Sequence, residues 1–199
     1  CNFAASFATP GEGPEFQEWQ PTVPAPDVLP PAPDFDDQYA EVMSYVAGTN
    51  AIEFRFEEGI ADRDPSSPGR WQVWFRVKDE LPDDQAIHSA MVAYASDIFL
   101  LETTLRPHSV GWLDDIDFAT IDYSMWFHRP FRLEGWNLLS FGAAMARGGR
   151  GVSYGELFTH DRIALASMTQ EGMTRFKPGR GEHLHQKVQE HSQRSAKPD

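Results

Sequence analysis

One carboxylate in this chain stands out because of its surroundings. Asp97 closes the run 94–97, which reads YASD and lies in a segment that is otherwise almost wholly apolar. A carboxylate in apolar surroundings costs free energy unless it is paired or used in chemistry. Asp97 is therefore a candidate general base. The structural alternative is a carboxylate that caps a kink or pairs with a buried arginine.

A functional role for Asp97 requires partners that can hold a water molecule beside it. Thr120 and Asp122 are spaced to share one face of a strand predicted over 117–127. Gln170 lies in the last predicted strand of the chain. An acid can accept the proton of a water while a hydroxyl and an amide fix its lone pairs. These residue types predict hydrolysis by an activated water, with no covalent nucleophile required.

The elements that must position these residues form an α+β pattern. A helix is predicted to start at 81–84, with Asp83 or Asp84 as its cap, and to run to about residue 104. Apolar residues surround this helix, so it is expected to be buried. A buried helix followed by antiparallel strands is an α+β layout. A short helix is predicted over 36–47, and alternation and turn residues predict strands over 52–56, 71–76, 117–127, 136–145, 150–159 and 163–175.

Composition limits the classes of partner. The chain has 199 residues, 41% of them hydrophobic, which fits one domain or one domain plus a fragment. A net charge of −13 argues against binding nucleic acid. The single Cys1 rules out an internal disulfide framework, and no apolar run is long enough to span a membrane. Because the chain begins at Cys1 rather than Met, we expect a processed or partial polypeptide.

The chain also contains a short internal repeat. Residues 2–7 and 163–168 both alternate, both contain Ala-Ser before a large apolar residue, and both run on into Glu and Gly. Residues 1–9 are therefore predicted to be the last strand of a first domain. Proline-rich residues 10–34 are predicted to be a linker, whose Trp19, Val23, Val28 and Leu29 favour contact with a folded surface. The main domain follows over 35–176, and 177–199 form a polar tail.

Three segments resemble the signature of type II acyl-CoA thioesterases, the TesB-like double-hotdog family. That family has a helix ending in YASD, a strand carrying ATIDHSMWFHRPF and a final strand with VQEG. Here the corresponding segments read YASD over 94–97, ATIDYSMWFHRPF over 119–131 and TQEG over 169–172. The departures are Tyr123 in place of His and Thr169 in place of Val. The resemblance covers roughly 70–176 and, more loosely, 3–33.

The resemblance implies both a fold and a reaction. The fold would be a hotdog, an antiparallel sheet wrapped around a long central helix, forming the second half of a double hotdog. Asp97, Thr120 and Gln170 would be the triad that activates water to hydrolyse fatty acyl-CoA to a free fatty acid and CoA. No cofactor is implied. The expected partners are the acyl-CoA substrate and a companion chain or segment carrying the first hotdog, within an oligomer.

Other residues permit other chemistries. Residues 151–155 match G-x-S-x-G, and Asp161 and His183 follow Ser153 in the order of a serine hydrolase. The nucleophile elbow needs a helix after the serine, and a continuing strand is predicted here instead. Cys1 has the position of an N-terminal nucleophile, although no oxyanion-binding residues are evident near it. A third alternative is an acyl-binding hotdog module without turnover.

The remaining candidates have weaker support. His128 lies in the HRPF turn, where Pro130 fixes the backbone, and is predicted to shape that turn rather than act as a base. A metal site is not predicted, because His183, His185 and His191 lack a further ligand in a polar tail. Three basic residues are candidates for contacts with CoA phosphates: Arg147, Arg150 and Lys177. We predict a cytoplasmic protein; a peroxisomal location stays open, although 196–199 are not a peroxisomal signal.

Overall fold

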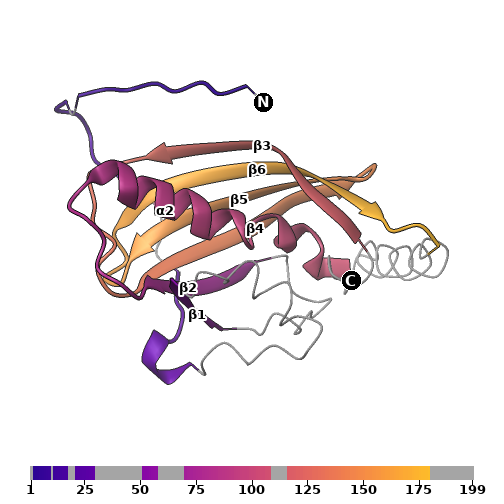
Figure 1. Ribbon diagram of the computed structural model, residues 1–199, viewed down its shortest axis with the longest axis horizontal. Coiled ribbons are helices and arrows are strands. Elements are labelled where there is room, and N and C mark those ends of the chain that lie inside the picture. Colours follow the sequence, from indigo (N-terminus) through magenta and orange to yellow (C-terminus); the bar gives the residue numbers. More distant parts are fainter. Residues whose placement is uncertain are drawn as a thin grey trace.

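The computed structural model describes residues 2–9, 11–17, 21–29, 51–57, 70–108 and 116–179. Within them, six antiparallel strands form one sheet in the order β1-β2-β4-β5-β6-β3, and the sheet curves around helix α2 (Figure 1). The α+β prediction is confirmed. The strands are β1 (Ile52–Phe56), β2 (Trp71–Val77), β3 (Ile116–Phe127), β4 (Asn137–Arg147), β5 (Arg150–Thr159) and β6 (Ala164–Phe176), and the helices are α2 (Gln85–Asp97) and the 3-10 turns η1 (Pro26–Val28), η2 (Leu101–Thr104) and η3 (Arg106–His108).

Helix α2 begins where the sequence predicts but ends earlier. The Asp84 carboxylate accepts a hydrogen bond from the Ala86 amide at 2.8 Å, as an N-cap does. The α-helix ends at Asp97 rather than near residue 104. Beyond it the hydroxyls of Thr103 and Thr104 donate to carbonyls three residues back, at 2.7 and 2.8 Å. Such local bonds favour a tighter turn, which continues the chain as η2.

The outer side of α2 is more exposed than the sequence suggests. The sheet covers only one side of the helix, and Ile87 and Tyr94 on the other side are exposed. The prediction of a helix buried all round is therefore wrong for α2. It holds for the following turns, where every residue from Phe99 to Arg106 is buried.

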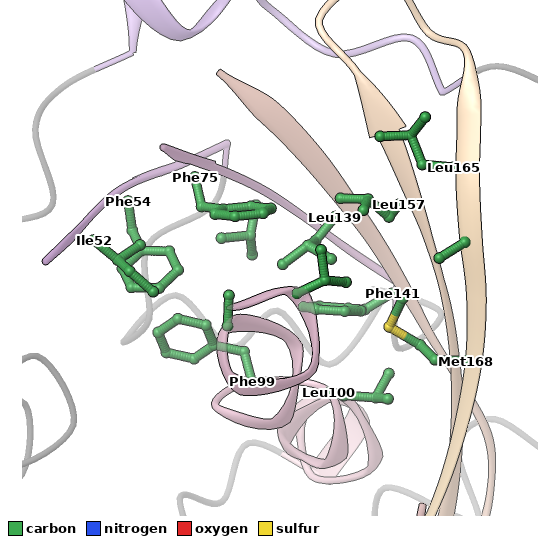
Figure 2. Close-up of a cluster of buried hydrophobic side chains, with 14 of the residues drawn as sticks. Ile52, Phe54, Phe75, Phe99, Leu100, Leu139, Phe141, Leu157, Leu165 and Met168 are labelled. Carbon is green, nitrogen blue, oxygen red and sulfur yellow. The ribbon is translucent and has the colours of Figure 1, made fainter. Parts of the chain in front are cut away.

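An aromatic cluster fixes the chain just after α2. The Phe99 ring meets Phe54, Phe56 and Trp71 edge to face, with centroids 5.1 to 5.4 Å apart. Such pairs add to the stabilisation from burial. Figure 2 shows Phe99 facing Phe54 and Ile52, while leucines of the sheet line the other side of the helix. Phe99 thus anchors the backbone two residues after Asp97.

Around Val23, the linker lies against the opposite face of the sheet. Val23 is buried with Trp74, Leu138 and Phe158, whose side chains point away from α2 by the two-residue period of their strands. The Trp74 indole donates to the Pro24 carbonyl at 3.0 Å. The predicted contact with a folded surface is confirmed for Val23 and Leu29. It is wrong for Val28, which is exposed, and Trp19 lies outside the described residues.

The N-terminal segment stands apart from the sheet. Residues 2–9 are extended and belong to no strand, and Phe3 and Phe7 are more than nine-tenths exposed (Figure 1). Pairing of this segment with a companion domain stays a prediction. The helix predicted over 36–47 and the tail beyond residue 179 lie outside the described residues.

Candidate active site

Three side chains from separate elements meet at the end of α2. The Gln170 amide nitrogen, from β6, donates to Asp97 Oδ1 at 2.6 Å and to Thr120 Oγ1 at 2.8 Å. The Thr120 hydroxyl, from β3, donates to the same Asp97 oxygen at 3.3 Å. An amide group has two hydrogens, so Gln170 can serve both acceptors at once. The three predicted site residues thus form one closed hydrogen-bonded set.

A β-bulge in β3 turns Thr120 toward the helix. Thr120 pairs with Gly172 of β6 and Asp122 pairs with Glu171, which leaves Ile121 as an extra residue. Adjacent residues of β6 point to opposite faces, so Thr120 and Asp122 do as well. The prediction that these two share a face is wrong, because the bulge breaks the two-residue period. The same bulge brings Tyr123 opposite Gln170, on the helix side.

The set is buried at one end and open at the other. The Gln170 side chain is about 1% exposed, whereas Asp97 and Thr120 are exposed. The expectation of a buried Asp97 is therefore wrong for this chain, because the helix ends at the margin of the sheet. The arrangement leaves a carboxylate accessible to water and held by an amide fixed beneath it.

A fourth residue belongs to this neighbourhood. The Tyr123 hydroxyl lies 2.6 Å from Ser96 Oγ and 3.6 Å from Met168 Sδ. Burial raises the pKa of Tyr123 to about 12, and the nearby charge of Asp97 adds to this increase. Sequence reasoning noted Tyr123 only as a departure from a motif. A uniform two-residue period would place Tyr123, three positions after Thr120, on the face away from α2, so the period alone could not find it.

Comparison with known proteins places the chain in a family. The family model described as acyl-CoA thioesterase matches residues 51–173. This chain belongs to the acyl-CoA thioesterase family. It is similar to acyl-CoA thioesterase 2 of Haemophilus influenzae, at 35% identity over 191 residues, covering 88% of this chain and 64% of the relative. Human acyl-coenzyme A thioesterase 8 is 31% identical over 191 residues, covering 87% and 59%.

Solved structures agree on the fold. Acyl-CoA thioesterase II TesB2 of Mycobacterium marinum aligns with a TM-score of 0.69 and 31% identity, covering 86% of this chain and 61% of that one. A hot dog protein from Alicyclobacillus acidocaldarius aligns at 0.64 with 18% identity, covering 84% and 58%, and supports the fold alone. The hotdog prediction is confirmed. The chain spans about three-fifths of the length of these relatives.

Ser153 lies in a different setting from a nucleophile elbow. It sits in β5, fully buried, with its hydroxyl oxygen 3.2 Å from that of Thr103. Gly148 and Gly149, both with positive φ, form the turn before β5, and the strand continues to Thr159. The predicted strand after a glycine turn is confirmed for this thioesterase-family chain. Cys1 and His183 lie outside the described residues.

The side chains of His128 and Arg150 lie on the outer face of the sheet, which is the face away from α2. The His128 ring lies 2.8 Å from Ser167 Oγ, and its backbone amide donates to Leu165 at 2.9 Å, which fits the predicted turn-shaping role. Arg150 bonds Glu171 at 2.9 Å on the face away from Thr120. Arg147 ends β4 and Lys177 follows β6, both at the same end of the sheet as Arg150.

Two further observations concern the residues that the structure describes. No group of three potential metal ligands occurs among them, and His183, His185 and His191 lie beyond them. Nor does any helix in these segments have the length and apolar character needed to cross a bilayer.

Proposed function

We propose that this chain carries the hydrolytic site of an acyl-CoA thioesterase, with Asp97 as the general base. The observation that carries the proposal is the closed set of bonds between Asp97, Thr120 and Gln170. Membership of the acyl-CoA thioesterase family supports the choice of a thioester substrate. The substrate would be a fatty acyl-CoA, and the products a free fatty acid and CoA.

The hydrogen bonds suggest different roles for the three residues of the site. Thr120 and Gln170 both donate to Asp97 Oδ1, so they orient the carboxylate. Among the described residues, Oδ2 takes part in no bond, which leaves it to accept a proton from water. The resulting hydroxide attacks the thioester carbonyl carbon, and the tetrahedral intermediate expels the CoA thiolate. Asp97 then returns its proton to that sulfur.

We also propose that a companion segment covers this site. Asp97 and Thr120 are exposed in the chain alone, and so are the apolar side chains of Ile121 on β3 and Tyr94 on α2. Strand β3 is an edge strand of twelve residues, and a long open edge with apolar side chains favours pairing with another chain. The expected first hotdog, and an oligomer built from both halves, fit these surfaces. The cytoplasmic location stays a prediction.

Replacement of Asp97 by Asn tests the proposal directly. The amide keeps the shape but removes the base, and loss of general-base catalysis costs ~10²–10⁴-fold in rate. Thr120→Ala and Gln170→Ala should each cost less, because each removes only part of the support. Binding of acyl-CoA should persist in Asp97→Asn, measured by calorimetry on the sample used for turnover, in the complete protein.

Asp122→Asn is the matched control for that experiment. It neutralises a carboxylate two residues from Thr120 on the same strand, but on the opposite face, so turnover should stay at the parental level. Parental turnover in Asp97→Asn would refute the proposal. Joint loss of folding and binding in that variant would show Asp97 to be structural.

A serine-directed reagent separates this mechanism from the Ser153 alternative. Ser153 is fully buried within β5 and bonded to Thr103. A fluorophosphonate should therefore leave acyl-CoA hydrolysis unchanged, since no serine ester forms in the proposed mechanism. Mass spectrometry that detects a covalent adduct on Ser153, together with lost activity, would favour the serine hydrolase. The intact Asp97 set weighs against a module without turnover.

A further inference from the structure

A hydroxyl pair joins β3 to the last turn of α2, directly beside the candidate base. The Tyr123 hydroxyl lies 2.6 Å from Ser96 Oγ, and Ser96 immediately precedes Asp97 in the chain. Ser96 is fully buried, whereas Asp97 is exposed. The pair therefore holds the backbone next to Asp97 from the buried side, while Thr120 and Gln170 hold its carboxylate.

Counting hydrogens gives the direction of this bond. Ser96 Oγ lies 2.6 Å from the carbonyl oxygen of Val92, four residues earlier in α2. That bond uses the one hydroxyl hydrogen of Ser96, so Tyr123 is the donor to Ser96 Oγ. Met168 Sδ, at 3.6 Å, is a weak second acceptor. A phenylalanine at position 123 would keep the ring and remove only the donor.

The charge state of Tyr123 simplifies its role. Burial raises the pKa of Tyr123 to about 12, so the phenol stays neutral and remains a donor throughout the usual assay range. Removing this hydroxyl changes a hydrogen bond without changing the charge near Asp97.

The location of the bond matters because α2 ends there. Asp97 is the last α-helical residue, and η2 begins only at Leu101. Carbonyls in the last turn of a helix lack the bonds that hold its middle, so helix ends depend on other contacts. The bulge at Ile121 turns both Thr120 and Tyr123 toward α2. Strand β3 therefore bonds to the last turn of α2 at two points, the exposed Asp97 through Thr120 and the buried Ser96 through Tyr123.

We propose that Tyr123 is a positioning residue, whose bond to Ser96 fixes the last turn of α2 so that Asp97 faces the attacking water. The inference rests on the proposed function, because it assigns Tyr123 a task only if Asp97 is the base. Tyr123 bonds to neither Thr120 nor Gln170 and acts through Ser96. It is not itself a catalytic residue.

The test compares Tyr123→Phe, Ser96→Ala and the double variant in the complete protein. Steady-state kinetics on one acyl-CoA should give kcat about tenfold lower in each, the scale expected when a reacting group is slightly misplaced. KM should stay within about twofold, since ground-state binding is untouched. The double variant should be no worse than either single one, because both remove the same bond.

Two controls make the result decisive. Tyr154→Phe removes the hydroxyl of an exposed tyrosine on β5 and should leave kcat and KM unchanged. Circular dichroism should show the variants folded at the assay temperature. Parental kcat in Tyr123→Phe overturns the inference, as does a decrease that merely follows the folded fraction. If Tyr123→Phe keeps parental kcat but Asp97→Asn is inactive in the same series, the inference about Tyr123 fails and the proposed function still stands. If Asp97→Asn is fully active, both proposals fail.

Discussion

At the scale of single residues, Tyr123 is, among the described residues, the group whose ionisation the fold alters most clearly. Its phenol oxygen contacts the Ser96 hydroxyl and the Met168 sulfur, and burial favours the neutral form of the phenol. A folded-state pKa of about 12, against an ordinary value near 10, means that the folded state holds the proton more tightly than the unfolded chain. The associated stability is fully present below about pH 10 and is lost as pH rises toward 12.

Tyr123→Phe should therefore resist alkaline unfolding better than its neutral-pH stability suggests. Two pKa units correspond to about 2–3 kcal/mol of stability, which the parent loses between about pH 10 and 12 and the variant does not. Urea unfolding at pH 8 and at pH 11 measures the difference. A stability gap between parent and variant that is the same at both pH values would contradict the burial of the phenol.

Residue types were easier to predict than residue environments. Acid, hydroxyl and amide have complementary donors and acceptors, but the choice of Asp97, Thr120 and Gln170 as one set came from the resemblance to the thioesterase motifs. The exposure of Asp97 was not predictable, because it depends on what covers the helix end rather than on the neighbours of Asp97 in sequence. A run of apolar residues around an acid indicates burial only when every side of the helix is covered.

At the scale of elements, close approach between η2 and the sheet depends on two glycines. A Cβ at Gly151 would lie 2.8 Å from Thr104, and one at Gly172 would collide with Leu101 and come within 3.0 Å of the Ala119 carbonyl oxygen. The 3-10 turn after Asp97 therefore packs directly on the backbone of β5 and β6. This contact sets how near the end of α2 lies to Gln170.

Gly172→Ala should destabilise the protein. Overpacking of this kind typically costs ~1–3 kcal/mol, because Leu101 and the turn that carries it must shift. Gly13→Ala is the control, since a Cβ there meets nothing within 4 Å. Denaturant unfolding should show a lower midpoint for Gly172→Ala only. Equal midpoints for the two variants would contradict the close packing of η2 on the backbone of β6.

Strand limits were predictable where turn residues bound the strands. The expected limits of β4, β5 and β6 agree with the structure to within one or two residues, because Gly148 and Gly149 form the turn between β4 and β5 and the corner at Asp161 and Arg162 separates β5 from β6. The early end of α2 was not predictable in this way. It depends on hydroxyl-to-carbonyl bonds from Thr103 and Thr104, whereas the apolar pattern simply continues through them.

At the scale of the whole molecule, the corner between β5 and β6 is one of the points that hold the linker against the outer face of the sheet. Arg162 has a φ of 67°, and its guanidinium lies 4.7 Å from the centre of the Trp74 ring and donates to the Val23 carbonyl at 3.2 Å. Gln17 adds two bonds to the same corner, to the carbonyl of Arg162 and the amide of Ala164, both at 2.8 Å. The path of the chain before the main domain is thus fixed at this corner.

Arg162→Gly should release the linker without unfolding the sheet. Glycine accepts a positive φ without strain, so the variant removes the side-chain contacts and keeps the turn. Limited proteolysis should cut within 17–29 faster than in the parent, with the thermal unfolding midpoint little changed. Arg132→Ala, which removes a surface ion pair with Asp83, is the control and should not change the cleavage rate. Unchanged cleavage in Arg162→Gly would show that the remaining contacts, of Val23, Trp74, Gln17 and Arg55, hold the linker without Arg162.

The single extra residue in β3 makes the length of this segment as important as its composition. Ile121 separates two stretches of opposite parity, since Thr120 before it and Tyr123 after it both face α2. Deletion of Ile121 would leave a regular strand in which Thr120 and Tyr123 keep their partners Gly172 and Gln170 and still face α2. Straightening the bulge at constant length would instead invert every later side chain of the strand, moving Tyr123 to the outer face and Asp122 inward.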